Sequence, residues 1–254
     1  MSPLAASVEA APTRRAALAL AAAAVAVPAW AGLPGIVTPV MRLAGMVSAP
    51  PRVAITFDAC PGSFDWRIAA ALLEGGVPAT IFVSGVWMRQ NPKGLAFLLA
   101  HPDLFSLQNH GARHLACVLD ERRIWGLTPA VDLAGVETEV EDGARAVAEV
   151  TGQRPAWFRG AGAIYSPPAL DLIRRLGFGV AGFSLNGDVG TTLPAAAVAA
   201  RIGAARAGDV VISHINQPHR ASGKGVAKGV LALRRQGVRF VRLDALKPVD
   251  MIYS

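Results

Sequence analysis

The chain has 254 residues, of which 52% are hydrophobic and 17% are charged, and its formal net charge is +7 at pH 7. This composition is typical of a globular protein with a large core, and it excludes a disordered tail and, with two cysteines, a disulfide scaffold. The lysines and arginines are scattered and form no basic run with interleaved aromatics, so no nucleic-acid partner is expected.

The first 31 residues have the pattern of an export signal. Arg14 and Arg15 precede an Ala/Leu/Val run, and Ala29-Trp30-Ala31 follows as a small-x-small cleavage site. The two arginines predict a twin-arginine-type signal over residues 1–31. The alternative is an uncleaved anchor, but the run has about a dozen residues, where a membrane span needs about 20. We therefore expect a periplasmic or secreted mature protein with no stable membrane span.

A segment punctuated by proline and glycine leads from residue 32 to residue 51, and residues 52–254 are predicted to form one domain. In this domain, short β-branched and aromatic runs alternate with stretches whose apolar residues recur at helical spacing. The runs predict strands at residues 53–57, 79–83, 104–107, 156–158, 179–185, 209–213 and 238–243. The stretches predict helices at residues 66–73, 93–100, 132–150, 167–176, 194–207 and 224–236. An irregular insertion is expected at residues 115–128.

The predicted strands are almost continuously apolar and alternate with helices, which favours parallel pairing with the helices outside. A barrel and a doubly wound sheet both fit this pattern, and we favour a single-domain α/β barrel. In such folds the loops after the carboxyl ends of the strands carry the chemistry.

Ionisable residues stand where five of the predicted strands end. These residues are Asp58, His110, Arg159, Asp188 and His214. Residues scattered over a surface would not gather at five strand ends, so the rim that these ends form is predicted to be an active site.

His110 and His114 are four residues apart, directly after a predicted strand. If residues 110–114 form a helical turn, both imidazoles project to the same side. Two neutral imidazoles are half of a zinc-type site and leave coordination positions for water or substrate. The alternative is a pair of unrelated surface or capping histidines. The polar residues at the other strand ends favour the metal site.

Taken in order, the motifs resemble those of the polysaccharide deacetylases of the NodB-homology type, carbohydrate esterase family four. They are Thr56-Phe57-Asp58, His110-Gly111-Ala112-Arg113-His114, Phe158-Arg159, Asp188 and Ile212-Ser213-His214. The resemblance extends from about residue 52 to residue 243 and implies a distorted (β/α) barrel of seven or eight strands. It further implies an N-acetylated glycan as substrate and a divalent metal, for which zinc is expected and cobalt and nickel are alternatives.

The resemblance also implies a role for each ionisable residue of the rim. Asp58 would be the general base and His214 the general acid in the hydrolysis of an amide. Arg159 would keep Asp58 ionised, and Asp188 would raise the pKa of His214 so that its ring carries a proton. A backbone N–H near Gly162 would stabilise the oxyanion.

The chain departs from the family where a second Asp usually follows the base as the third metal ligand, because Ala59 stands there. Asp65 in the same loop is our first choice for the missing ligand. The alternatives are a Cys60 thiolate and a site of two histidines with water. Cys60 could instead be buried, or bridged to Cys117. A subset of family members that reads Thr-Phe-Asp-Ala-Cys resembles this chain here, which indicates a systematic change.

Substrate contacts are expected from the segment after Arg159 and from the insertion. Where the family often has two prolines and an aromatic, this chain has Gly160-Ala161-Gly162 and, later, Tyr165. We expect Gly162 and Tyr165 to face the substrate. Trp125 is the tryptophan that we expect to stack on a sugar ring, although tryptophans more often belong to the core.

The leading interpretation is a secreted metal-dependent hydrolase that removes N-acetyl groups from an amino-sugar polymer or oligomer, chitin-like or peptidoglycan. One alternative is a deacylase or deformylase of a smaller or lipid-linked amide. Another is a catalytically weak glycan-binding protein on a deacetylase scaffold, which the missing carboxylate motivates. The positive net charge is compatible with an anionic cell-envelope polymer.

Overall fold

The computed structural model describes residues 35–44, 50–246 and 251–253. The predicted signal at residues 1–31 lies outside the described residues. Within the described ranges, no helix combines the length and the apolar character that crossing a membrane requires.

Strands and helices alternate along the chain, as the apolar patterns predict. The strands are β1 (Met41–Leu43), β2 (Arg52–Ala59), β3 (Ala79–Val83), β4 (Phe105–Asn109), β5 (Trp157–Phe158), β6 (Gly179–Val180), β7 (Leu185–Asn186), β8 (Val210–His214), β9 (Arg239–Phe240) and β10 (Met251–Tyr253). The α-helices are α1 (Trp66–Glu74), α2 (Gly85–Gln90), α3 (Pro92–Leu99), α4 (Leu133–Thr151), α5 (Pro167–Arg175), α6 (Ala195–Gly203) and α7 (Ser222–Arg235). Short 3₁₀ helices are η1 (Ala161–Ala163) and η2 (Leu243–Ala245).

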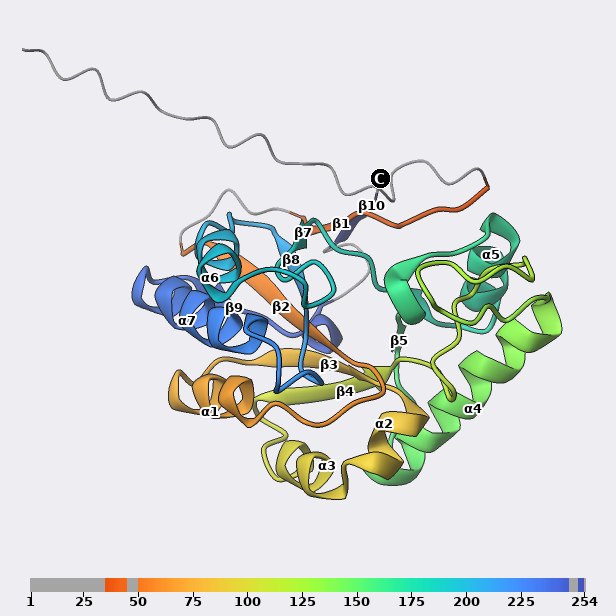
Figure 1. The fold of residues 1–254 in the computed structure, drawn as a ribbon, viewed down its shortest axis with the longest axis horizontal. Coiled ribbons are helices and arrows are strands. Elements are labelled where there is room, and N and C mark those ends of the chain that lie inside the picture. The colour runs from red at the N-terminus through yellow and green to blue at the C-terminus, as the bar shows by residue number, and fades with distance from the viewer. Residues whose placement is uncertain (1–34, 45–49, 247–250, 254) are drawn as a thin grey trace, which may run out of the picture. The chain divides into compact units, whose positions relative to one another are not determined.

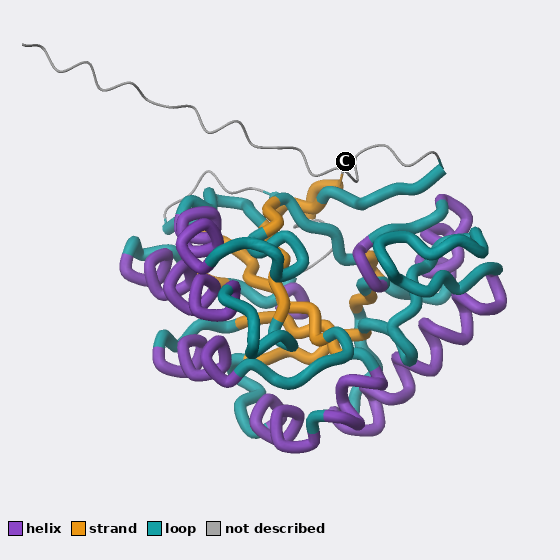
Figure 2. The backbone as a smooth tube through the Cα atoms, viewed as in Figure 1, coloured by secondary structure: helices purple, strands orange, loops and turns teal. Residues whose placement is uncertain are grey.

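The main sheet has the strand order β6-β5-β4-β3-β2-β8-β7, and each neighbouring pair is parallel. Strand β9 adds to the amino-terminal end of β2, also in parallel. The helices lie on the outside of the sheet (Figure 1), and the tube trace shows the strands enclosed by helices and loops (Figure 2). This architecture confirms the prediction of a single-domain distorted (β/α) barrel.

The central strands are buried along almost their whole length. Every residue of β3 and β4 is buried, and in β2 the first residue alone is partly exposed. Leu72 of α1 and Leu233 of α7 belong to the core cluster that covers these strands. These strands are buried on both faces, by helices on the outside and by the barrel interior on the inside. Such strands have almost continuous runs of apolar residues, which is why the sequence pattern identified them.

The barrel is open between β6 and β7, since no ladder joins these two strands among the described residues. The predicted strand at 179–185 is split in two because Phe183 instead exchanges backbone hydrogen bonds with Pro39 and Met41. Gly182 passes so close to the carbonyl oxygen of Pro39 that a Cβ would overlap it. Residues 35–44, expected as a lead-in separate from the domain, therefore pack against it.

The short helix α2 is not predicted by the apolar pattern. The Oγ of Ser84 caps it by accepting a hydrogen bond from the backbone N–H of Trp87 at 3.2 Å. Trp87 is fully buried. A six-residue helix is too short to show helical periodicity, so its cap residue is the one local signal for it.

Candidate active site

The register of the sheet sets the ionisable side chains at one level of the barrel. Asp58 near the end of β2 stands opposite His214, the last residue of β8. His110 and Arg159 each follow a residue of the paired position Asn109–Phe158 on β4 and β5. Strand ends in register thus bring residues from four distant parts of the chain to the same rim.

Arg159 is fully buried and reaches across the barrel to Asp58. Its Nη1 donates to Asp58 Oδ1 at 2.9 Å, and its Nε and Nη2 donate to the carbonyl oxygens of Ala181 and Gly182. The guanidinium carbon lies over the ring of Phe82, 4.3 Å from the centroid. A guanidinium with this many partners is fixed in place, so Asp58 is held in one orientation.

Asp58 is 2% exposed, so the surrounding charges decide its ionisation. Burial acts to raise the pKa of Asp58, but Arg159, His110 and His214 outweigh it, and the pKa lies below its usual value. The carboxylate is therefore ionised at neutral pH, which is the state that a general base requires.

His214 forms a dyad with Asp188, which is fully buried in the loop after β7. Asp188 Oδ1 accepts from His214 Nδ1 at 2.9 Å, and Oδ2 accepts from the backbone N–H of His214 at 2.8 Å. Burial acts to lower the pKa of His214, but the charge of Asp188 and its hydrogen bond raise that pKa well above the usual value. The imidazole is thus held protonated, as a general acid must be.

The segment from His110 to His114 is an irregular loop, and the expectation of a helical turn is wrong. Gly111 has φ 81° and His114 has φ 66°, both in the left-handed region that a helix excludes. The loop nevertheless brings the two imidazoles together, with ring centroids 5.0 Å apart. The two imidazoles are therefore close together, as the spacing of His110 and His114 predicts, but a bent loop brings them together and not a helical turn.

Glu139 of α4 holds this loop in shape. Its buried carboxylate accepts hydrogen bonds from the backbone N–H groups of Arg113 and Leu115, and it pairs with the Arg113 side chain at 3.5 Å. A Cβ on Gly111 would overlap the same carboxylate. Sequence reasoning missed Glu139. The signal was a lone acidic residue on the apolar face of a helix, where a buried charge needs partners.

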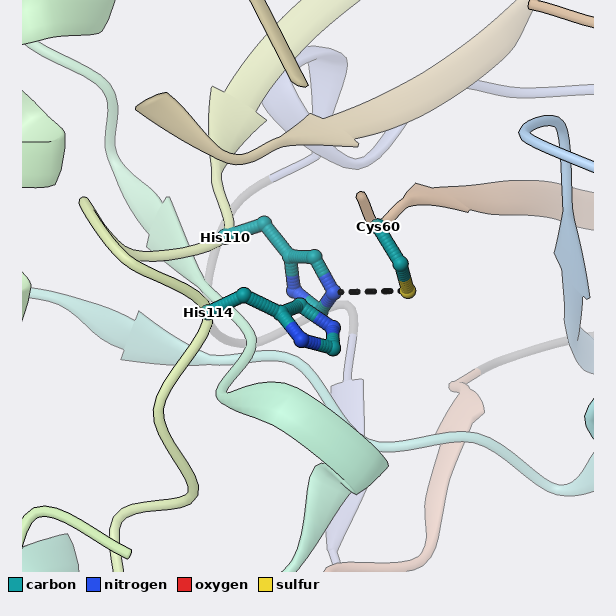
Figure 3. Close-up of side chains that lie close together, drawn as sticks. All are labelled: Cys60, His110 and His114. Carbon is teal, nitrogen blue, oxygen red and sulfur yellow. Dashed lines mark hydrogen bonds between the residues drawn. The ribbon is translucent and has the colours of Figure 1, made fainter. Parts of the chain in front are cut away.

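Cys60, directly after β2, joins the histidine pair (Figure 3). Its Sγ lies 3.4 Å from His110 Nε2, and one donor atom from each of Cys60, His110 and His114 lies within 4.8 Å of the other two. Burial acts to raise the pKa of the Cys60 thiol, but the two imidazoles outweigh it, and the pKa lies well below its usual value. The cluster therefore favours the thiolate form of Cys60.

These residues fit a divalent metal. The Nδ1 of His110 donates to the carbonyl oxygen of Arg159 at 2.6 Å, which leaves the lone pair of Nε2 facing the cluster. His114 Nε2 is buried and has no hydrogen-bond partner among the described residues. Cysteine and histidine donors are the set that zinc prefers.

Two predicted site residues, Asp65 and Tyr165, make contacts that prevent the roles expected for them. Asp65 is the N-cap of α1 and forms an ion pair with Arg67 at 2.6 Å, so its carboxylate serves the helix terminus and is absent from the cluster of metal donors. Tyr165 is fully buried, and its Oη accepts the backbone N–H of Gly160 at 2.8 Å. We therefore correct both expectations: Asp65 is not placed as a metal ligand, and Tyr165 offers no surface to a substrate.

The remaining substrate residues stay predictions. Gly162 lies in η1 with φ 72°, and a Cβ there would lie 2.7 Å from Leu127, so the position requires glycine. Trp125 is 52% exposed and lies in the insertion. The turn at Gly162 and the exposed ring at Trp125 suit a backbone donor and a stacking surface respectively.

Both cysteines are free, so the disulfide alternative does not hold in this structure. Cys117 is fully buried, and its Sγ lies close to Gly160. Burial and the nearby charge of Glu139 raise the pKa of its thiol. Cys117 is a packing residue, whereas Cys60 faces the two histidines.

A family model described as Polysaccharide deacetylase matches residues 47–181, which include Asp58, both histidines of the pair and Arg159. The match agrees with the family that the motifs resemble. A comparison with curated proteins finds no match.

Several solved structures have the same fold. A CE4 family pseudoenzyme, BA3943 from Bacillus anthracis, has 17% identity and a TM-score of 0.61, over 77% of this chain and 65% of that chain. Peptidoglycan deacetylase PdaC from Bacillus subtilis has 19% identity and a TM-score of 0.62, over 77% and 89%. A family 4 carbohydrate esterase from Streptomyces lividans, in complex with acetate, has 18% identity and a TM-score of 0.59, over 76% and 93%. The chain thus spans less than two thirds of the pseudoenzyme's length.

Proposed function

The chain belongs to the polysaccharide deacetylase family, and from this premise we propose that it hydrolyses N-acetyl groups on an amino-sugar polymer or oligomer. The observation that carries the proposal is the rim itself. An ionised carboxylate, a protonated imidazole and a pair of imidazoles suited to a metal share one end of the barrel. These are the groups that the hydrolysis of an unactivated amide needs.

The residues of the chain divide the proton transfers between them. Asp58 accepts a proton from the attacking water, and Arg159 keeps that carboxylate ionised and oriented. His214 donates its proton to the nitrogen of the leaving amine, and Asp188 holds the ring in the required orientation. A divalent metal held by His110 and His114 would polarise the acetyl oxygen and acidify water.

The names of the related structures support the proposed substrate class, and one of them supports the alternative of a protein without catalytic activity. PdaC is a peptidoglycan deacetylase, and the Streptomyces lividans esterase was solved in complex with acetate. The Bacillus anthracis protein is a pseudoenzyme. Because Ala59 removes a carboxylate that the family usually has, a catalytically weak glycan-binding protein is the alternative to test.

Acetate release from a panel of substrates tests the proposal. The purified protein, loaded with zinc, cobalt or nickel, is incubated with N-acetylated chitooligosaccharides, with peptidoglycan and with a small aryl acetamide. Release from a glycan is the expected result. Release from the small amide alone supports a deacylase of smaller substrates, and polymer binding without any release supports the glycan-binding alternative. Either of these two results overturns the proposal.

We also propose that residues 1–31 direct export by the twin-arginine route, because Arg14 and Arg15 precede an apolar run and a small-x-small site. Changing both arginines to lysine should leave the protein in the cytoplasm, as cell fractionation would show. The adjacent arginines Arg234 and Arg235 at the end of α7 are the matched control, and their replacement by lysine should not affect export. Export of the first variant would contradict the proposal.

A further inference from the structure

We propose that Cys60 supplies the third protein ligand of the metal, beside His110 and His114, in place of the carboxylate that the family usually has at the position of Ala59. The inference rests on the metal dependence proposed above. It goes beyond that proposal because it gives the site a sulfur donor in place of the usual carboxylate.

The separations of the donor atoms agree with a shared cation. In a tetrahedral zinc site with a Zn–S bond of about 2.3 Å and Zn–N bonds of about 2.0–2.1 Å, neighbouring donors lie about 3.3–3.6 Å apart. Cys60 Sγ lies 3.4 Å from His110 Nε2, and the three donor atoms are within 4.8 Å of one another. Figure 3 shows Cys60 facing the two rings from a different loop.

The imidazoles are already oriented for such a cation. The carbonyl oxygen of Arg159 accepts from His110 Nδ1, so the coordinating nitrogen of His110 is the one that faces Cys60. His114 Nε2 is buried without a hydrogen-bond partner among the described residues. A buried ring nitrogen is rarely left unpaired, and a shared metal would satisfy it.

Other candidates for the third ligand are excluded by their surroundings. The methyl group of Ala59 has no donor atom. Asp65 is engaged with Arg67 and with the terminus of α1. Asp58 Oδ1 is paired with Arg159, and Asp58 Oδ2 lies 3.9 Å from His110 Nε2, but Asp58 does not belong to the group of donor atoms that lie within 4.8 Å of one another.

The loop that carries Cys60 is fixed by side chains from other loops. Asn216 Nδ2 donates to the carbonyl oxygen of Pro61 at 3.1 Å, and Asn91 Nδ2 donates to that of Gly62 at 2.8 Å. A Cβ on Gly62 would lie 2.5 Å from the carbonyl oxygen of Asn216. The sulfur is therefore held in position before a metal binds, as a ligand must be for tight and selective binding.

A second role for this sulfur has to be distinguished. A thiol nucleophile, an imidazole and a carboxylate make a cysteine hydrolase triad, and Cys60 with His214 and its partner Asp188 would be the residues of such a triad here. The orientation of His110 and His114 toward the sulfur favours metal ligation. A cysteine nucleophile needs a single imidazole as its base, and a triad with His214 would leave His110 and His114 without a role.

Cobalt substitution tests the ligand directly. Metal-free protein titrated with cobalt(II) should develop a sulfur-to-cobalt charge-transfer absorption in the near ultraviolet with one equivalent of metal. The absorption should be lost in Cys60→Ser and retained in Cys117→Ser, the matched control with a buried thiol away from the cluster. Cys60→Asp should bind cobalt without the absorption, and circular dichroism of each variant checks that it is folded.

Wild-type protein that binds cobalt without the absorption, or absorption that persists in Cys60→Ser, would overturn the assignment. So would a Cys60 acetyl adduct trapped by mass spectrometry during turnover of metal-free protein. Acetate release is scored separately. Sulfur ligation without acetate release would refute the proposed function alone, and acetate release without sulfur ligation would refute this inference alone.

Discussion

At the scale of single residues, the Asp188–His214 dyad sets the pH range of the proposed reaction. Asp188 contacts both the Nδ1 and the backbone N–H of His214 and raises the pKa of the ring. The dyad therefore stabilises the folded state at pH values below the unfolded pKa of about 6.5, and that contribution is lost as the pH rises through the higher folded value. The same protonation should keep His214 active as the proposed general acid into the alkaline range.

Asp188→Asn should move the alkaline limb of the kcat/KM profile to lower pH, because the amide no longer favours the imidazolium. The measurement is the pH dependence of acetate release. Asp171→Asn is the control, since Asp171 is an exposed acid on α5 with a surface partner. An unchanged alkaline limb in Asp188→Asn would show that His214 is not the group that titrates there.

Residues at strand ends could be predicted from sequence, because an apolar run ends visibly and the next polar residue must lie at the rim. This reasoning placed Asp58, His110 and His214 on one rim of the fold. The sequence names Cys60 as one of several candidates for the third metal ligand but does not favour it over Asp65. The turn between these two residues decides which side chain faces the histidines. Side-chain direction within a loop depends on hydrogen bonds from distant residues, which a sequence pattern does not contain.

At the scale of elements, α4 and the loop after β4 act as one unit. Gly143 of α4 packs so tightly on this loop that a Cβ would overlap Asn109 Oδ1 and lie 2.7 Å from the carbonyl carbon of Gly111. Glu139, one turn earlier, accepts the backbone N–H groups of the loop. The paired imidazoles of His110 and His114 thus depend on a helix that carries none of the predicted site residues.

Glu139→Gln should destabilise the fold and weaken metal binding, because its amide nitrogen would face backbone donors. Each buried donor left unpaired costs about 1–3 kcal/mol of unfolding free energy. Chemical denaturation and zinc titration measure the two effects, with Glu137→Gln, an exposed acid on the same helix, as the control. Zinc affinity equal to that of the wild type would show that the loop keeps its shape without this carboxylate.

Gly143→Ala should lower the free energy of unfolding by about 1–3 kcal/mol, the usual cost of forcing an extra methyl group into a packed contact. Gly203→Ala in α6 is the matched helical control, because its added Cβ would meet a single neighbour at 3.9 Å. There, better helix propensity should leave stability unchanged or raise it by up to about 1 kcal/mol. Equal effects of the two substitutions, measured by denaturant unfolding, would contradict the close packing of α4 on the loop.

The elements themselves were predictable where a strand is continuously buried or a helix is long. The predicted range 79–83 coincides with β3, and the long helix predicted at 132–150 is α4. The range 179–185 was mispredicted as one strand, because its centre pairs with the lead-in segment at Pro39 and Met41. Such pairing between distant segments leaves no trace in local periodicity.

At the scale of the whole domain, the open side of the barrel contributes to the candidate active site. Residues 181–184 cross the gap between β6 and β7, and the carbonyl oxygens of Ala181 and Gly182 bind the guanidinium of Arg159. Because the strand is irregular there, these two carbonyl oxygens accept hydrogen bonds from Arg159, whereas in a regular β-ladder they would accept them from a neighbouring strand. The distortion of the barrel therefore serves to hold the arginine that orients Asp58.

Metal content and acetate release, measured on the same samples of wild-type protein, Asp58→Asn and His110→Ala, test the central claim most directly. If the rim divides metal binding from proton transfer, Asp58→Asn should keep one equivalent of metal and lose turnover by about 10²–10⁴-fold. His110→Ala should lose both metal and turnover. Wild-type turnover in Asp58→Asn, or metal and turnover retained in His110→Ala, would contradict the account.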